Sequence, residues 1–272
     1  KILMKTAVCI HGLARGSTSP AMGAYNEKFS TLKSLIPNTD IFIHSWDTDI
    51  SKELKDIFCP IDYIIEPQKQ FDKEIIFFKG IDLYSKNTSP KQGEIFKTLS
   101  FLYSRHKSIE LKAFYEDKNN FKYDCVLTTR FDAGHHGGGR NKTSHLNFDP
   151  SLDMGNLYQA YWPQTNAGAS DHWFYSNSNN INALGDLYNV IFEYLQPDSE
   201  YSNWCKEGWP LSNSQDEFSN ELFRDSPTLS SRKLTSGNTV LVNNHCIYKY
   251  HLMKHNLWEN NNIFLNKDLW DS

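Results

Sequence analysis

Tyr123-Asp-Cys-Val-Leu-Thr-Thr-Arg-Phe-Asp132 is the part of this chain that says most about its fold. Its first half, Tyr123 to Leu127, is a short apolar run of the kind that forms a buried strand. The run ends in a cation and a carboxylate, Arg130 and Asp132, and a glycine-rich loop over residues 133–140 follows. Ligands of open α/β sheets bind outside the carboxyl ends of the strands. The stretch therefore predicts a strand that carries Arg130 and Asp132 to an anion site, with or without a metal. An ordinary ion pair at a strand end is the alternative.

Strand and helix patterns alternate on the amino-terminal side of this stretch. Strands are expected at Thr6–Ile10, Asp40–His44 and Tyr63–Pro67, and helices at Tyr25–Leu35, Ser51–Phe58 and Gln92 to about Glu116. Residues 68–91 are polar and aromatic and are expected to form a long excursion. Alternation of this kind is typical of an α/β fold, in which a mostly parallel central sheet is flanked by helices.

The carboxyl-terminal half is less regular. Strands are expected at Leu157–Trp162, Asp171–Tyr175, Leu241–Val242 and Ile247–Tyr250, and helices at Ile181–Leu195 and Gln215–Phe223. The last 17 residues are expected to wrap the surface. The length of 272 residues fits a single large domain.

Composition argues against several classes of protein. The formal net charge is −4 and no dense basic patch occurs, so nucleic acid is not expected as the main partner. No run approaches the roughly 20 apolar residues that span a membrane, so no transmembrane segment is expected. The five cysteines are scattered without a C-x-x-C pair, which favours neither a zinc cluster nor a disulfide framework. A reducing compartment, and hence a cytoplasmic location, is expected.

Polar residues also follow the first two predicted strands. His11-Gly12-Leu13-Ala14-Arg15-Gly16 follows the first strand, and its glycines and arginine suit an anion or a nucleotide. Neither a dinucleotide fingerprint nor a P-loop is present. Trp46 and Asp47 follow the second strand, where a ring can stack on a base and a carboxylate can accept bonds from ribose. The alternatives are a tight turn at His11–Gly16, and a core tryptophan with Asp47 capping the next helix.

Two later segments add candidates for catalysis and metal binding. Asp171 begins an aromatic segment and is a candidate general base for a sugar hydroxyl. A buried carboxylate that holds a loop is the alternative. His245 is a candidate metal ligand together with Asp132, and a packed or surface histidine is the alternative.

These segments together resemble the sugar-nucleotide glycosyltransferases of the GT-A fold, of the type that builds bacterial and viral surface polysaccharides. The resemblance rests on Ala7–Arg15, Asp40–Asp47 and Tyr123–Asp132, and more loosely on Asp171–Tyr175. It covers roughly residues 5–175. It implies a Rossmann-like GT-A fold with a nucleotide-binding half over about 1–132 and an irregular acceptor-side half over about 133–272.

The resemblance also implies roles for individual residues. His11, Gly12, Arg15, Trp46 and Asp47 would hold the nucleotide of a nucleoside-diphosphate sugar, with a UDP-sugar favoured. The family's Asp-x-Asp, which binds Mn²⁺ or Mg²⁺, corresponds here to Arg130-Phe131-Asp132. Asp132 then helps to bind a metal, or Arg130 partly replaces the metal by neutralising the leaving diphosphate. Asp171 would deprotonate the hydroxyl of a glycan acceptor in a direct displacement.

Two other classes of function compete with this interpretation. A nucleotide-sugar or sugar-phosphate hydrolase would use Asp132 and the histidines. A non-catalytic carbohydrate-binding protein would account for the seven tryptophans and fourteen tyrosines. The hydrolase needs no sugar acceptor, and the binding protein needs no nucleoside diphosphate.

Overall fold

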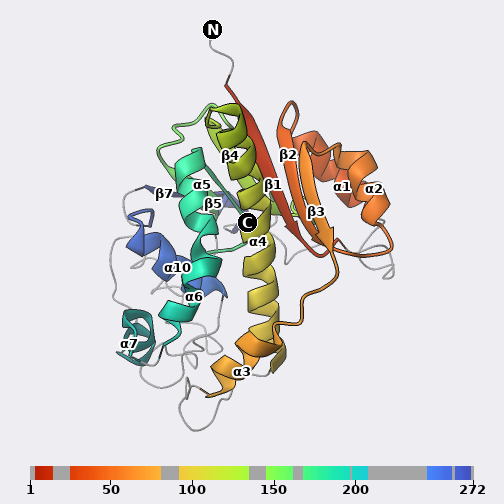
Figure 1. Cartoon of the computed structure of the whole chain (residues 1–272). Helices are drawn as coiled ribbons and strands as arrows, with labels where there is room; N and C mark the ends of the chain where they lie inside the picture. Colours follow the sequence, from red (N-terminus) through yellow and green to blue (C-terminus); the bar gives the residue numbers. More distant parts are fainter. Residues whose placement is uncertain are drawn as a thin grey trace.

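A computed structural model describes residues 4–14, 25–80, 92–134, 145–161, 168–196, 198–207, 244–258 and 261–270. One sheet of seven strands runs through both halves of the described chain, with helices on its two faces (Figure 1). The α/β architecture with a mostly parallel sheet, expected from the alternating pattern, is confirmed.

The amino-terminal half of the sheet is parallel. Its strands are β1 (Thr6–Gly12), β2 (Asp40–Trp46), β3 (Asp62–Glu66) and β4 (Cys125–Arg130). They lie in the order β3-β2-β1-β4, and each adjacent pair is parallel. The first, second and fourth are buried almost throughout, which is why their sequences read as continuous apolar runs.

The remaining strands extend the sheet beyond β4 with mixed directions. They are β5 (Leu157–Ala160), β6 (Trp173–Ser176) and β7 (Asn262–Leu265). The order continues β4-β6-β5-β7, and β6 is antiparallel to both of its neighbours. The last strand is parallel to β5, so the carboxyl-terminal segment joins the sheet instead of only wrapping the surface.

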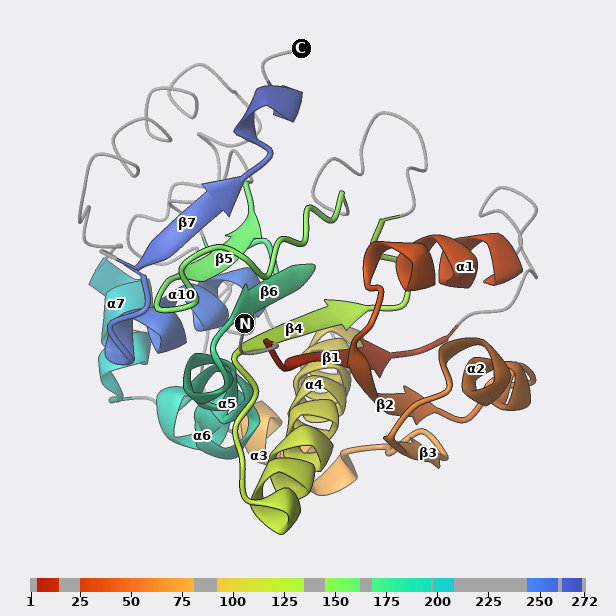
Figure 2. The ribbon, with the colours of Figure 1, turned by 90° about the horizontal axis from the view of Figure 1, so that it is seen from above.

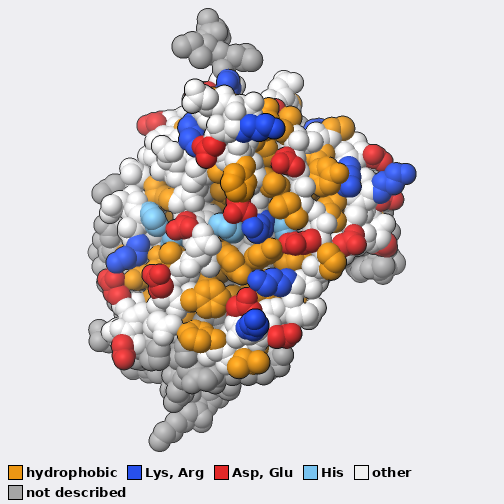
Figure 3. Space-filling model, viewed as in Figure 1, with side chains coloured by type: hydrophobic (Ala, Val, Ile, Leu, Met, Phe, Trp, Pro, Cys, Tyr) orange, Lys and Arg blue, Asp and Glu red, His pale blue; other side chains and the backbone are white. Residues whose placement is uncertain are grey.

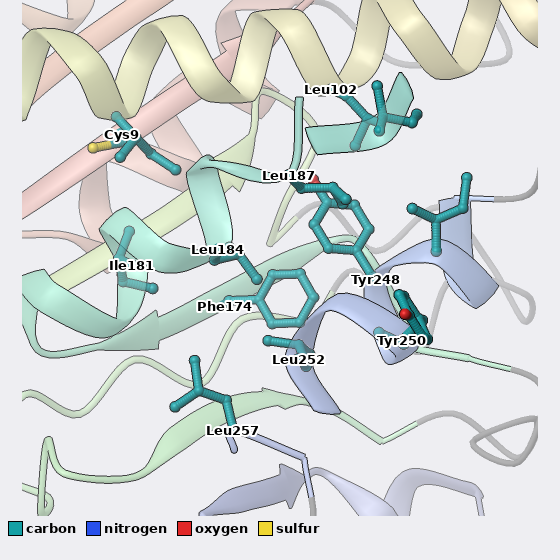
Figure 4. Close-up of a cluster of buried hydrophobic side chains, with 14 of the residues drawn as sticks. Cys9, Leu102, Phe174, Ile181, Leu184, Leu187, Tyr248, Tyr250, Leu252 and Leu257 are labelled. Carbon is teal, nitrogen blue, oxygen red and sulfur yellow. The ribbon is translucent and has the colours of Figure 1, made fainter. Parts of the chain in front are cut away.

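Helices cover the sheet on both faces (Figure 2). One face packs against α1 (Tyr25–Leu35) and α2 (Ser51–Phe58), and these apolar residues form one core with the inward side chains of β1, β2 and β4. The helices away from that face are α3 (Asp72–Gly80), α4 (Gln92–Asn119), α5 (Ser178–Gly185), α6 (Leu187–Tyr194), α7 (Glu200–Glu207), α10 (Asn244–Lys254) and the short 3₁₀ helix η3 (Lys267–Trp270). The second core lies between the sheet and several of these helices, and Figure 4 shows Phe174 of β6 beside Tyr248 of α10 within it.

The longest helix, α4, organises the second face. It packs along β1 and β2, as its apolar spacing suggested, and extends three residues beyond the expected end at Glu116. No helix within the described residues is both long and apolar enough to cross a membrane.

Two expectations for the second half were wrong, and two others lie on residues that the structure does not describe. Ile247–Tyr250 lies in the helix α10, where every residue from Cys246 to Leu252 is buried. A helix that is buried on all sides has no amphipathic period that the sequence could show, so the β-branched and aromatic residues of α10 suggested a strand. Ile181–Leu195 forms two helices, α5 and α6, which meet at Asp186. The segments Gln215–Phe223 and Leu241–Val242 lie outside the described residues.

A buried ion pair ties α4 to α5. The Nζ atom of Lys112 donates to Glu116 Oε2 at 2.9 Å, to Ser178 Oγ at 2.6 Å and to Asn182 Oδ1 at 2.6 Å. Both charged side chains have no solvent exposure. All three donors of the ammonium are therefore satisfied inside the protein.

We expect Lys112→Met to destabilise the protein by about 3–5 kcal/mol, because it leaves the buried Glu116 charge uncompensated. Desolvation opposes ionisation of Glu116, but its hydrogen-bond partners outweigh it and lower the pKa of the carboxyl. The stabilisation is thus present above the unfolded pKa, about 4.3, and is lost as the pH falls through the folded value. A series of urea unfolding curves between pH 7 and about pH 3 measures both effects, because the loss takes place below the unfolded pKa of about 4.3. Lys107→Met, at a partly exposed lysine of the same helix that pairs with Glu110, is the matched control and should cost less than about 1 kcal/mol.

Candidate functional site

The strand order creates a topological switch point, and we use the word crevice for the region outside the carboxyl ends of β1 and β4 at this point. From β1 the chain continues to β2 on one side, whereas β4 lies on the other side. Such a reversal of strand order is a topological switch point, and ligands bind there outside the carboxyl ends of the strands. Gly12 ends β1 and Arg130 ends β4 at this edge. Because β6 is antiparallel to β4, with Thr129 opposite Trp173, the residues that precede β6 lie at the same edge.

Arg130 and Asp132 form a bidentate pair at the end of β4. Arg130 Nε donates to Asp132 Oδ1 at 2.9 Å, and Nη2 donates to Oδ2 at 2.6 Å. The side chains are 35% and 41% exposed, so solvent and ligands can reach them. Desolvation opposes ionisation of Asp132, but the charge and hydrogen bonds of Arg130 outweigh it and lower the pKa of the carboxyl. The ion pair considered from sequence is present, and its guanidinium keeps further N–H donors outside the pair.

Asp171 lies beside this pair in an unusual backbone conformation. Its φ is +53°, in the left-handed region that non-glycine residues adopt at a cost of about 1–2 kcal/mol. The residue is only 6% exposed. Desolvation opposes the charge of Arg130, but Asp132 and, to a smaller extent, the charge of Asp171 outweigh it and raise the pKa of Arg130. The Oδ2 atom of Asp171 lies 3.9 Å from Nδ1 of His245. Asp171 and Arg130, the two residues predicted to be catalytic, are thus electrostatic neighbours.

The segment before Asp171 is fastened to the start of α10. The Ala169 N–H donates to the His245 carbonyl at 3.0 Å, and His245 Nδ1 lies 2.7 Å from the Ala169 carbonyl. Gly168 packs so closely on this turn that an added Cβ would lie 2.2 Å from the His245 carbonyl oxygen. The close backbone approach requires glycine and holds His245 next to Asp171.

His172 is a member of the cluster that the sequence did not single out. Desolvation, followed by the charge of Arg130, lowers the pKa of His172, so its imidazole is neutral near pH 7. The charges of Asp171 and Asp132 act on the same ring in the opposite direction. The position of His172 directly after Asp171 in the sequence could have marked it as a candidate.

Two residues predicted to hold the nucleotide face away from the crevice. His11 and Trp46 are 0% and 1% exposed. Trp46 stacks on Tyr103 of α4 with 5.5 Å between ring centroids, so its ring is not free for a base. Both side chains project from the face of the sheet that α4 covers. The prediction that His11 and Trp46 contact a nucleotide directly is therefore corrected.

The other predicted nucleotide contacts differ in their accessibility. Gly12 has a φ of +111°, and an added Cβ would meet no atom of the described residues within 4 Å. Asp47 is exposed and accepts a hydrogen bond from Ser51 Oγ at 2.7 Å, at the start of α2. It is not the residue that caps α2, since Ile50 occupies that position. Arg15 lies outside the described residues.

The predicted metal ligands do not form a metal site within the described part of the chain. No group of three or more His, Cys, Asp or Glu side chains there has the geometry to hold a metal ion. Both carboxylate oxygens of Asp132 accept bonds from Arg130, and Nδ1 of His245 is directed at the Ala169 carbonyl. The described residues therefore do not fit the Mn²⁺ or Mg²⁺ that the resemblance implies.

A second candidate residue that the sequence did not single out, Arg105, lies beneath the crevice. Arg105 of α4 is 1% exposed and contacts His11 and Asp171. It lies three residues after Leu102 and four before Ile109, within the apolar stripe of the helix. A charged residue within an apolar stripe could have marked Arg105 in the sequence as a buried and unusual side chain.

Two further surface features, a cavity and a face of mixed charge, lie outside this site. A cavity of about 570 Å³ lies at the opposite edge of the sheet, where Tyr123, Asp124 and Asn177 line it. On the face shown in Figure 3, acidic and basic side chains are interspersed, which is not the single-sign surface that nucleic acid binds.

A scan against protein-family models, a search of curated proteins and a search of solved structures each gave no match to this chain.

Proposed function

We propose that the protein is a glycosyltransferase of the GT-A type that transfers a sugar from a nucleoside-diphosphate sugar, with a UDP-sugar favoured, to a hydroxyl of a glycan. The observation that supports this most is the convergence of Arg130, Asp132 and Asp171 at the switch-point edge. Binding to the glycan would take place on the side of β6. Surface-polysaccharide synthesis in the cytoplasm is the setting that we propose.

The reaction would be a direct displacement at the anomeric carbon. The Asp171 carboxylate takes the proton of the acceptor hydroxyl, and the acceptor oxygen forms a bond to the anomeric carbon. The bond between that carbon and the phosphate oxygen breaks, and its electron pair leaves with the nucleoside diphosphate. The low exposure of Asp171 keeps bulk water away from the proton transfer.

Arg130 is the residue that we propose to stabilise the leaving diphosphate. Its pair with Asp132 uses Nε and Nη2, so Nη1 can donate to phosphate oxygens while the pair persists. A fixed guanidinium aimed at developing negative charge lowers the barrier without reorganisation of solvent. Asp132 then orients Arg130 instead of binding a metal.

A panel of nucleotides and nucleotide sugars, read by the melting temperature, tests the donor class. A ligand at 100 times its Kd stabilises the folded state by about 2.7 kcal/mol. We expect UDP-sugars to raise the melting temperature and free sugars to leave it unchanged. Stabilisation by glycans alone would support a carbohydrate-binding protein instead.

Product analysis with and without a glycan acceptor separates the transferase from the hydrolase. A transferase forms a new glycoside only when the acceptor is present. Release of free sugar at an undiminished rate without acceptor would favour the hydrolase.

A further inference from the structure

Arg105 is a buried cation that forms no ion pair with a carboxylate of the described residues. The side chain is 1% exposed, and no ion pair within 4.0 Å joins it to a carboxylate of the described residues. Three aromatic rings surround the guanidinium, with Cζ at 4.7 Å from the centroid of Phe101, 5.2 Å from Phe174 and 4.9 Å from Tyr248. Burial of an unpaired charge is costly, and arginine is almost never fully buried unless it is paired. The rings offset part of that cost through cation–π attraction.

The hydrogen bonds of Arg105 join two strands that do not touch each other. Its Nε donates to His11 Nε2 at 2.7 Å, and its Nη2 donates to the Asp171 carbonyl at 2.5 Å. His11 belongs to β1 and Asp171 precedes β6, and β4 lies between these two strands. One side chain of α4 therefore reaches both sides of the crevice from beneath.

We infer that Arg105 is a positioning residue, which holds Asp171 in its left-handed conformation and so directs the carboxylate toward Arg130. This inference rests on the proposed function for its catalytic consequence. A non-glycine residue keeps a left-handed backbone conformation only where several surrounding contacts hold it there. The bond to the Asp171 carbonyl holds the peptide group that follows the strained position. The ties between Ala169 and His245 hold the chain two residues before it.

His11 is the second anchor of Arg105. Because Arg105 donates to Nε2, the proton of the imidazole must be on Nδ1 and the ring must be neutral. Desolvation, followed by the charge of Arg105, lowers the pKa of His11 well below its ordinary value, in agreement with this tautomer. A neutral His11 accepts from Arg105 without adding a second buried charge.

Arg105→Met and Arg105→Lys test the inference. We expect both variants to lower kcat for sugar transfer about 100-fold, the effect that a displacement of about 1 Å can have, with little change in KM for the donor. Lysine keeps the charge, but its single ammonium cannot reach both acceptors. Full activity in Arg105→Lys would overturn the positioning role, since charge alone would then suffice.

A double variant separates positioning from a general loss of stability. In the background of Asp171→Asn, Arg105→Met should lower the residual rate less than about threefold, because the misplaced group no longer acts as a base. A further loss of 100-fold would show that Arg105 acts independently of Asp171. Lys112→Met is the matched control, a buried cation of the same helix that has no contact with the crevice, and it should keep the wild-type kcat below its melting temperature.

Two measurements test the inference without an assay of enzymatic activity. Hydrogen exchange over residues 168–173 should be faster in both Arg105 variants and unchanged in Lys112→Met. In the wild-type protein, ¹⁵N NMR of His11 should show a neutral ring with the Nδ1–H tautomer at about pH 6.5, where an ordinary histidine is roughly half protonated. This measurement needs no variant to fold. An Nε2–H tautomer or unchanged exchange would overturn the inference. If the wild-type protein transfers no sugar, the proposed function fails, and these two measurements still decide whether Arg105 holds Asp171.

Discussion

Asp171→Asn is expected to lower sugar transfer by about 10²–10⁴-fold, the contribution of a general base, while the affinity for the donor stays the same. Asparagine cannot accept the proton of the acceptor hydroxyl, but it tolerates the left-handed backbone that Asp171 adopts. The backbone should therefore remain in place and the chemistry alone should be lost. Initial rates with a saturating donor, together with calorimetric titration of the donor, measure the two quantities separately.

Asp153→Asn is the matched control for this variant. Asp153 lies at the opposite edge of the sheet, where its Oδ1 accepts from the Gly155 N–H at 2.9 Å. An asparagine oxygen can accept the same bond, so the control should have wild-type activity. Full transfer by Asp171→Asn would remove Asp171 from the role of the base and leave His172 as the neighbouring candidate.

Arg130→Met combined with Asp132→Asn is expected to lower transfer by about 10²–10³-fold, the cost of removing one group that stabilises transition-state charge. The second substitution avoids an unpaired carboxylate at the end of β4. Because the lost interaction acts on the leaving diphosphate, the effect should be much smaller with a glycosyl fluoride of the same sugar. Rates with both donors measure this dependence on the leaving group.

Arg130→Lys and Lys254→Met are the controls. Lysine keeps a charge near the diphosphate but loses the bidentate pair with Asp132, so an intermediate rate is expected. Lys254 lies at the end of α10 remote from His245, where it pairs with Glu200 of α7, and its substitution should not affect transfer. Equal losses with the nucleotide sugar and with the fluoride would contradict a role for Arg130 at the leaving group.

The parallel half of the sheet was predictable because each of its elements carries a local signal. The helices at Tyr25–Leu35 and Ser51–Phe58 have the predicted bounds, and the four strands differ from the expected ranges by a few residues. Apolar runs of strand length between amphipathic helices leave few alternative arrangements. The carboxyl-terminal half was less predictable, since α10 is buried on all sides and β7 is a short strand whose pairing with β5 is set by distant residues.

The sequence by itself determined that Arg130 and Asp132 end a buried strand of a parallel sheet, because the apolar run and its polar end are local features. Only the tertiary structure decided which of the other strand-end residues face the crevice. Side chains of a strand alternate between two faces, and the packing of α4 on one face placed His11 and Trp46 inside the core. The antiparallel pairing of β6 with β4 brought Asp171 to Arg130, and Arg105 reached both sides from below. Strand direction, the choice of face and long-range contacts depend on how the elements pack together, and no local pattern encodes them.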